Sequence, residues 1–325
     1  MFTDAIEVIL RDHCTPSVIR SIEKGGSARE LWSRFSDAGF MDLLVPEEEG
    51  GAGLAFGQLW EILVLLGEYV LPVPLAHTIV AKSIVSSRKD LPTGMTTLAP
   101  SLISDPAGRI SCQMVPFGAV ADHILTTDGD QLFLLDVRES QRKLPGIHGS
   151  LSASFSWNDG KGVKKLGGDP EALKSVAAAV YSALMLGAMR RTFEMTMDFC
   201  NNRVQFGKQI SKFQSIQHQL SVMAEQIAAV SIASESAFVG VDGTPALLRS
   251  AIAKARASEA VPLVANTAHA LHGAIGVTEE YDLQLFTRRL HEWRMFHGAE
   301  TYWNSIVGHH FLAESMTLSE FVRAN

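Results

Sequence analysis

The sequence predicts a mainly α-helical protein with a small β-rich segment in the middle of the chain. Two long stretches with helical spacing of apolar residues flank one stretch of short apolar runs separated by Gly, Asp and Pro. The chain has 325 residues, 46% of them hydrophobic, which is enough to bury a core in two or three structural units. We therefore expect an N-terminal helical domain over residues 1–90, a β-rich middle domain over 91–166 and a C-terminal four-helix bundle over 167–325.

The N-terminal domain is predicted from a helical pattern that breaks at residues 24–26 and again in the glycine-rich loop at 46–53. Its first segment, MFTDAIEVILRDHC, mixes acidic and apolar residues, which indicates an amphipathic helix and not a signal peptide. Its most apolar stretch, residues 61–80, contains two glutamates and two prolines, and so falls short of the roughly 20 apolar residues that a membrane span needs. We expect no membrane association.

The middle domain is predicted from short apolar runs such as Leu132–Leu135, with a hairpin turn expected at residues 128–130. The helical period then returns after an expected Asp169 N-cap with proline at the first turn. Helices are expected near 170–201, 212–239, 245–271, 282–295 and 300–313. The second carries an apolar seam typical of a bundle, formed by Phe213, Ile216, Leu220, Met223, Ile227 and Val230.

Charge and cysteine content limit the function classes. The net charge is −7 and the pI is near 5.9. Nucleic acids and anionic membranes attract clustered Lys and Arg, so we expect neither as a partner. The three cysteines lie far apart and lack the C-x-x-C spacing of metal or redox sites, so we expect neither, and a reducing cytoplasm fits best. The expected partners are a small molecule and other protein subunits.

One turn of the predicted bundle carries residues suited to an anion and a heterocycle. Arg203 at a helix end, Phe206 three residues on and Gly207 at the bend can present a guanidinium to an anion beside a stacking ring. The R-x-x-F-G spacing alone is equally typical of a helix C-cap with a solvated arginine.

The longer string RVQFGKQISKFQSIQHQLSVMAE resembles the R-x-x-F-G-x-x-[IL]-x-x-F-Q signature of the acyl-CoA dehydrogenases. In that family the Arg, the Phe and the Gln of F-Q contact the FAD of a neighbouring subunit. The resemblance therefore implies FAD as cofactor, with Arg203, Phe206 and Gln214 among its ligands. It also implies an acyl-CoA substrate, a role in lipid metabolism, and either a homo-oligomer or a heterotetramer with a second acyl-CoA dehydrogenase-like chain.

Three further stretches share this resemblance. Residues 31–75 are similar to the family's N-terminal helical domain, and MVPFGAVADHILTT resembles the strand pair that ends its middle domain. ALHGAIGVTEEYDLQLFTRRL matches the family's H-G-x-x-G segment, which passes close to the flavin pyrophosphate and adenosine. This match implies a cofactor contact for His272 and Gly273, and glycines do allow backbone N–H groups to approach phosphates.

The catalytic base is where the sequence departs from the family. The family's reaction removes an α-proton with a carboxylate, and counting places His297 at the usual base position and Ala177 at the less common one. His297 can serve as a base or can be a neutral residue that fills the position. Glu300 is a second candidate base, although an acid in the first turn of a helix usually interacts with the dipole. The acids at 279, 280 and 282 are interpreted as a solvated loop.

The middle domain departs as well, because nothing in residues 100–118 matches the family's T-E-x-x-x-G-S-D loop at the flavin ring.

The first functional expectation is an FAD-dependent acyl-CoA dehydrogenase that introduces a 2,3-double bond, with an unusual base such as His297. The chain would be a subunit of an oligomer with shared flavin sites. The alternative is a catalytically silent subunit of a heterotetramer that completes the partner's FAD site. A weaker alternative is an oxygen-using flavin monooxygenase or oxidase. The acyl chain of the substrate remains open.

Overall fold

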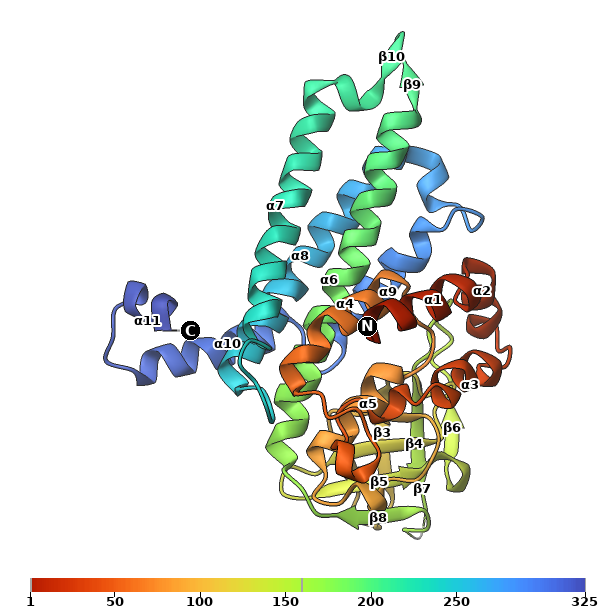
Figure 1. Cartoon of the computed structure of the whole chain (residues 1–325), viewed down its shortest axis with the longest axis vertical. Coiled ribbons are helices and arrows are strands. Elements are labelled where there is room, and N and C mark those ends of the chain that lie inside the picture. Colours follow the sequence, from red (N-terminus) through yellow and green to blue (C-terminus); the bar gives the residue numbers. More distant parts are fainter. Residues whose placement is uncertain (1, 159, 325) are drawn as a thin grey trace.

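The computed structural model describes residues 2–158 and 160–324 (Figure 1). Helices come first, two small sheets follow and helices return to the end, which confirms the predicted mainly α fold class. The N-terminal helices are α1 Phe2–His13, α2 Pro16–Glu23, α3 Arg29–Asp37, α4 Trp60–Glu68 and α5 Leu75–Ile84. Short 3₁₀ turns at Phe40–Asp42, Glu47–Glu49 and Phe56–Leu59 carry the chain through the glycine-rich loop between α3 and α4.

The middle region is built from two four-stranded sheets, with the orders β1-β4-β5-β8 and β2-β3-β7-β6. All pairs are antiparallel except β1 with β4. The predicted turn at residues 128–130 joins β4 to β5, where the Asp128 carboxylate accepts from two backbone amides. The strands are β1 Thr96–Leu98, β2 Ile103–Ser104, β3 Ile110–Val115, β4 His123–Thr127, β5 Leu132–Asp136, β6 Gln141–Lys143, β7 Ala153–Trp157 and β8 Val163–Leu166.

The C-terminal helices lie within three residues of the predicted ranges. The Asp169 carboxylate accepts from the Glu171 amide 2.9 Å away, so the predicted N-cap with Pro170 behind it is present. On α7, four of the six predicted seam residues are buried. The helices are α6 Pro170–Asn202, α7 Gln214–Ser236, α8 Leu247–His272, α9 Leu283–Met295, α10 Glu300–Ala313 and a short α11 Leu318–Ala324.

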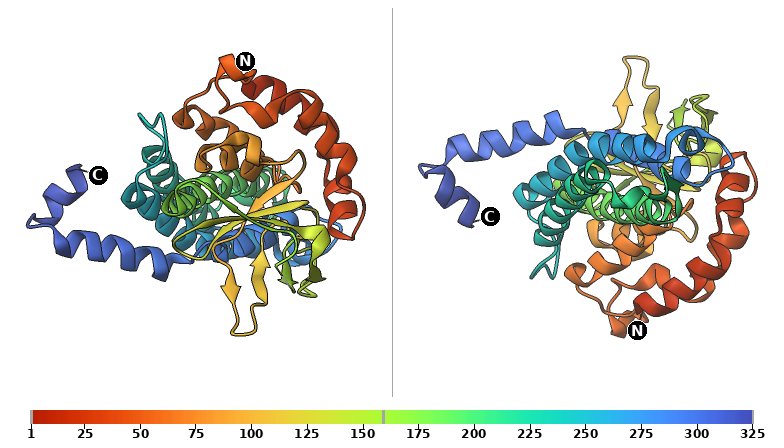
Figure 2. Two further views of the ribbon diagram at one scale, coloured as in Figure 1. Left: turned by 90° about the horizontal axis from the view of Figure 1, so that it is seen from below. Right: turned by 90° about the horizontal axis from the view of Figure 1, so that it is seen from above.

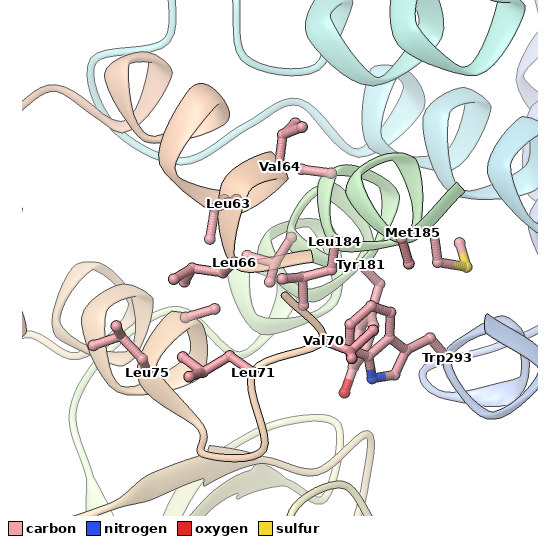
Figure 3. Close-up of a cluster of buried hydrophobic side chains, with 14 of the residues drawn as sticks. Leu63, Val64, Leu66, Val70, Leu71, Leu75, Tyr181, Leu184, Met185 and Trp293 are labelled. Carbon is pink, nitrogen blue, oxygen red and sulfur yellow. The ribbon is translucent and has the colours of Figure 1, made fainter. Parts of the chain in front are cut away.

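Helix α6 is the central element and packs directly against α4 (Figure 3). Glycine permits this contact on both helices. A Cβ on Gly187 would lie 1.9 Å from the Val64 carbonyl oxygen, and one on Gly67 would lie 2.1 Å from that of Leu184. Around the crossing, the side chains of Leu63, Leu66 and Leu184 are buried in the core. The N-terminal domain is therefore held against the bundle by backbone approach as well as by side-chain burial.

Within the described residues, α6 is the one helix long and apolar enough to cross a membrane by length and composition. Its most apolar window has a mean hydropathy of 1.5, and 94% of that window is buried inside the fold. Such burial is what the core helix of a packed domain requires.

The C-terminal arm, defined as α10 and α11, extends away from the bundle (Figures 1 and 2). Trp303 near the start of α10 is fully buried, whereas Leu312, Leu318 and Val322 farther along are exposed. Residues 318–324 form a helix that the sequence did not predict, and Phe321 in it packs edge-on against the Phe311 ring.

Candidate functional site

The bend between α6 and α7 forms a two-stranded hairpin of β9 Val204–Gln205 and β10 Lys208–Gln209. The hairpin stands at the far end of the bundle from the sheets (Figure 1). Phe206 and Gly207 at its tip both have positive φ, 51° and 79°. Gly207 adopts this conformation freely, whereas a non-glycine residue there costs about 1–2 kcal/mol. A strained aromatic residue at a tip is typical of a functional contact.

The predicted contact groups at this tip are exposed. The Phe206 ring is 92% exposed, and Gln214 is exposed at the start of α7. The Arg203 side chain is exposed and forms no ion pair within the described residues, while its backbone N–H caps α6 by donating to the Phe199 carbonyl at 2.9 Å. The tip thus exposes the unpaired Arg203 guanidinium, the Phe206 ring and the Gln214 amide to solvent and to any bound partner.

The turn at His272 and Gly273 adjoins the same end of α6. The His272 ring is buried and stacks on Phe199, with ring centroids 4.5 Å apart. Its Nδ1–H donates to the Ala268 carbonyl at 2.8 Å, which leaves Nε2 buried without a partner among the described residues. Gly273 is exposed with a φ of 64°. The backbone of Gly273 is therefore open to a ligand, whereas the His272 ring faces the interior.

The turn between α9 and α10, residues 296–298, holds the predicted base candidate. His297 is 6% exposed and has a φ of 54°. Its Nε2 lies 3.2 Å from the Leu98 carbonyl oxygen, and since a carbonyl only accepts, Nε2 carries the proton. Burial lowers the pKa of His297 to about 4, and nearby Lys254 contributes in the same direction. The imidazole is therefore neutral at physiological pH, with one nitrogen committed to the β1 backbone.

Aromatic rings fill the space around this turn. Tyr181 lies between His77 and His297, with ring centroids 5.3 and 5.6 Å away. The His77 Nδ1 lies 3.2 Å from the Leu98 amide nitrogen and 3.0 Å from the Thr97 hydroxyl, and its Nε2 and the Tyr181 hydroxyl are both buried without a partner among the described residues. Figure 3 shows Tyr181 beside Trp293. At the other predicted base position, Ala177 is fully buried on α6. Neither base position offers a carboxylate.

Glu300, the second candidate base, opens α10 with its carboxylate held by the Arg294 guanidinium, one of whose bonds is 2.9 Å long. The hydrogen bond from Arg294 is the largest cause that lowers the pKa of Glu300. This carboxylate is ionised at neutral pH but is already paired. The geometry thus favours a structural role for Glu300 at the start of α10.

A buried lysine, which the sequence analysis did not single out, fastens the 296–298 turn to α8. Lys254 Nζ donates to the carbonyl oxygens of Arg294 and Gly298 and to the Ser258 hydroxyl, each at 3.0 Å. Burial lowers the pKa of Lys254 to about 7. The available signal was a single lysine within the alanine-rich stretch of residues 250–260, a pattern that only burial distinguishes from a solvated helix face.

A cavity of about 500 Å³, termed the central cavity, lies between the middle domain and α9. Met114 and residues 147–150 line one side, and α9 from residue 287 to Phe296 lines the other. Behind it, the buried Glu23 of α2 receives Arg288 at 2.8 Å and Arg289 at 2.7 Å. Arg289 also pairs with Glu292, whose carboxylate accepts from Ser150. This network joins all three regions of the chain.

Comparison with known proteins identifies related chains. Residues 1–86 match the N-terminal domain and residues 175–312 the C-terminal domain of acyl-CoA dehydrogenases. Acyl-CoA dehydrogenase IpdE2 of Mycolicibacterium smegmatis is 27% identical over 297 residues, covering 90% of this chain and 91% of its own. Its namesake from Mycobacterium tuberculosis is 26% identical over 300 residues, covering 90% of each chain.

Solved structures share the fold. A chain of the ChsE4–ChsE5 complex from Mycobacterium tuberculosis superposes with a TM-score of 0.84 at 23% identity, covering 97% of both chains. Butyryl-CoA dehydrogenase from Megasphaera elsdenii superposes with a TM-score of 0.76 at 19% identity, covering 96% of this chain and 97% of its own.

Proposed function

Because this chain belongs to the acyl-CoA dehydrogenase family, whose cofactor is FAD, we propose that it is the base-lacking subunit of a two-chain acyl-CoA dehydrogenase. In this proposal the exposed tip around Arg203 completes an FAD site on the partner chain. The partner supplies the carboxylate that removes the α-proton of the acyl-CoA thioester.

One observation carries the proposal: the chain exposes the groups predicted to bind the dinucleotide and buries the residue at the predicted base position. A catalytic base must reach the proton that it removes. His297 instead donates to the Leu98 carbonyl inside the protein, and Glu300 is paired with Arg294. By contrast, Arg203 forms no ion pair within the described residues.

The tip fits FAD held by another chain. A free guanidinium suits the pyrophosphate, an exposed ring suits a stacked heterocycle, and an amide suits the polar edge of a ring system. Arg203, Phe206 and Gln214 would hold these parts, and the exposed Gly273 backbone could approach a phosphate. When bound, FAD supplies the hydride acceptor of the family's reaction. This chain's contribution is to bind and orient the cofactor.

The central cavity fits an FAD of the chain's own poorly. A pyrophosphate needs unpaired cations or free backbone amides. Arg288 and Arg289 are both bound to Glu23, and the Met114 amide already donates to the Ser154 hydroxyl at 3.1 Å. We therefore infer one FAD for each pair of chains. The ChsE4–ChsE5 structure is a complex of two different chains, which supports a two-chain assembly.

Flavin stoichiometry tests the proposal. The chain is expressed alone and together with acyl-CoA dehydrogenase-like chains encoded beside it, and the visible spectrum and flavin content of each preparation are measured. We expect a colourless chain alone and about one flavin for two chains in the complex, bleached by the appropriate acyl-CoA. A yellow protein with one flavin per chain, purified alone and reduced by an acyl-CoA, would show that the chain is a complete dehydrogenase.

A further inference from the structure

The bend between α6 and α7 concentrates positive charge. Residues 203–214, RVQFGKQISKFQ, include the cations Arg203, Lys208 and Lys212 and no acid, in a chain whose net charge is −7. Arg203 and Lys208 are exposed, and neither forms an ion pair within the part of the chain that the structure describes. A local excess of positive charge in an acidic protein favours an anionic ligand at this bend.

The strand pairing of the hairpin places Lys208 on the same face as Arg203. Lys208 lies directly opposite Gln205 in the antiparallel register, and side chains directly opposite one another share a face. Gln205 follows Arg203 by two positions, which is the period of a strand, and the Ile210 amide continues the pairing by donating to the Arg203 carbonyl at 2.9 Å. One face of the hairpin therefore carries a guanidinium, an amide and an ammonium.

An aromatic ring holds the Lys208 ammonium at the hairpin. Its Nζ lies 4.2 Å from the centroid of the half-buried Phe213 ring, which is a cation–π contact. The Phe213 ring in turn meets the Phe206 ring edge to face, with centroids 6.2 Å apart and an angle of 88° between the ring planes. Lys208 therefore loses less side-chain freedom when a ligand binds than a lysine that extends freely into solvent.

We infer that Lys208 is a second cation for the pyrophosphate of the FAD held by the partner chain, acting from the same hairpin face as Arg203. Both phosphate groups of a dinucleotide are negatively charged, so Arg203 alone leaves one of the two charges uncompensated. A guanidinium binds an oxyanion as a planar fork, and an ammonium acts as a compact point charge beside it. The inference rests on the proposed function, because it needs that FAD site, and it adds a residue that separates a dinucleotide from an uncharged flavin.

Flavin titration of the assembled complex, stripped of its cofactor, tests this inference. Flavin fluorescence measures the binding of FAD, and of riboflavin, which lacks the pyrophosphate, to the wild type and to Lys208→Met. Methionine keeps a flexible apolar chain beside the Phe213 ring and removes the charge. We expect Lys208→Met to weaken FAD binding about tenfold and to leave riboflavin binding unchanged, because only FAD brings the charges that the ammonium pairs with. Lys208→Arg should keep FAD affinity close to that of the wild type.

Lys212→Met is the matched control. Lys212 is an exposed lysine on the 3₁₀ turn Ile210–Lys212, outside the strand pair. We expect FAD to bind this variant with wild-type affinity. Raising the salt concentration should weaken FAD binding less in Lys208→Met than in the wild type, since the variant has one charge fewer to be screened.

Four results would overturn the inference. Equal weakening of FAD and riboflavin binding by Lys208→Met would make Lys208 a structural residue of the hairpin. Equal effects of Lys208→Met and Lys212→Met on FAD binding would reduce the effect to the general charge of the segment. Unchanged FAD binding in Lys208→Met, together with weakened binding in Arg203→Met, would assign the pyrophosphate to Arg203 without Lys208 and leave the proposed function intact. Unchanged FAD binding in both variants would refute the proposed function as well.

Discussion

The hairpin tip at residues 203–214 and the turn at residues 296–298 both combine a ring-bearing residue of positive φ with a basic side chain, but these groups are exposed at the tip and buried at the turn. At the tip, a strained aromatic residue and an uncompensated guanidinium face outward. At the turn, His297 is equally strained but buried, and Lys254 is bonded to three partners. Exposed polar groups at the tip are hydrated and remain available to a ligand from outside the chain, whereas the buried groups at the turn already have partners within the core.

Removing the free cation at the tip should give the largest effect. We expect Arg203→Ala to weaken FAD retention by the assembled complex by roughly 30- to 150-fold, the equivalent of about 2–3 kcal/mol for a hydrogen bond to a charged group. Flavin content after gel filtration at several dilutions measures this. Arg138→Ala is the control, because Arg138 in the middle domain is exposed and pairs with Asp136. Equal retention in the two variants would remove the cofactor role of the tip.

At the buried turn, removing the Lys254 ammonium should lower the free energy of unfolding and leave flavin retention unchanged. Lys254→Met removes the donor to the Arg294 carbonyl, while Gly298 keeps its bond from the Trp303 indole at 3.0 Å. One buried acceptor left unpaired predicts a loss of about 2 kcal/mol in the free energy of unfolding, measured by urea titration. A loss of flavin without a loss of stability would reverse the assignment of the two regions.

The same lysine predicts a pH dependence. Its folded pKa of about 7 lies below the ordinary value of 10.5, so between these values the unfolded chain binds more protons than the folded chain. Lys254 therefore contributes a rise in the free energy of unfolding of up to about 1.4 kcal/mol per pH unit above pH 7, and no change below it. Urea titrations of the wild type and Lys254→Met at pH 7 and pH 8.5 should differ in this slope. Parallel slopes would mean that Lys254 is not buried as described.

His297→Ala separates a base from a residue that fills space. If His297 is structural, the complex should keep its turnover while the free energy of unfolding falls by about 1–2 kcal/mol, because the Leu98 carbonyl loses its donor. Steady-state kinetics and urea titration on one preparation measure both quantities. Abolished turnover with unchanged stability and flavin content would make His297 the base and this chain a dehydrogenase.

The smallest expected effect concerns backbone strain at the tip. Phe206→Asn should stabilise the chain by up to about 1 kcal/mol, since asparagine tolerates positive φ better than phenylalanine. It should also reduce FAD retention, because the exposed ring is lost. Phe213→Leu, which removes a partly buried ring contact of Phe206, serves as the comparison. Unchanged flavin retention in Phe206→Asn would make the strain a feature of the hairpin alone.

The order of helices and strands, and the helix ranges of the bundle, could be predicted from the sequence because they follow from local rules. Apolar spacing, the Asp169 cap and the turn at residues 128–130 are each decided by a few neighbouring residues. The motif around Arg203 could also be recognised in the sequence, since its residues are close together in the chain. The positive φ angles of Phe206 and Gly207 form the turn of its hairpin. Whether Arg203 holds FAD stays a prediction.

The state of the base position was decided only by the tertiary structure. His297, Leu98 and Lys254 lie on three distant segments, and their contacts form only once β1, α8 and α9 have packed together. The central cavity depends in the same way on α2, on the 147–150 segment and on α9, whose charges neutralise one another across the fold. Burial and charge pairing are sums over such distant neighbours, so the sequence determined which groups were available and the packing decided which of them remained free.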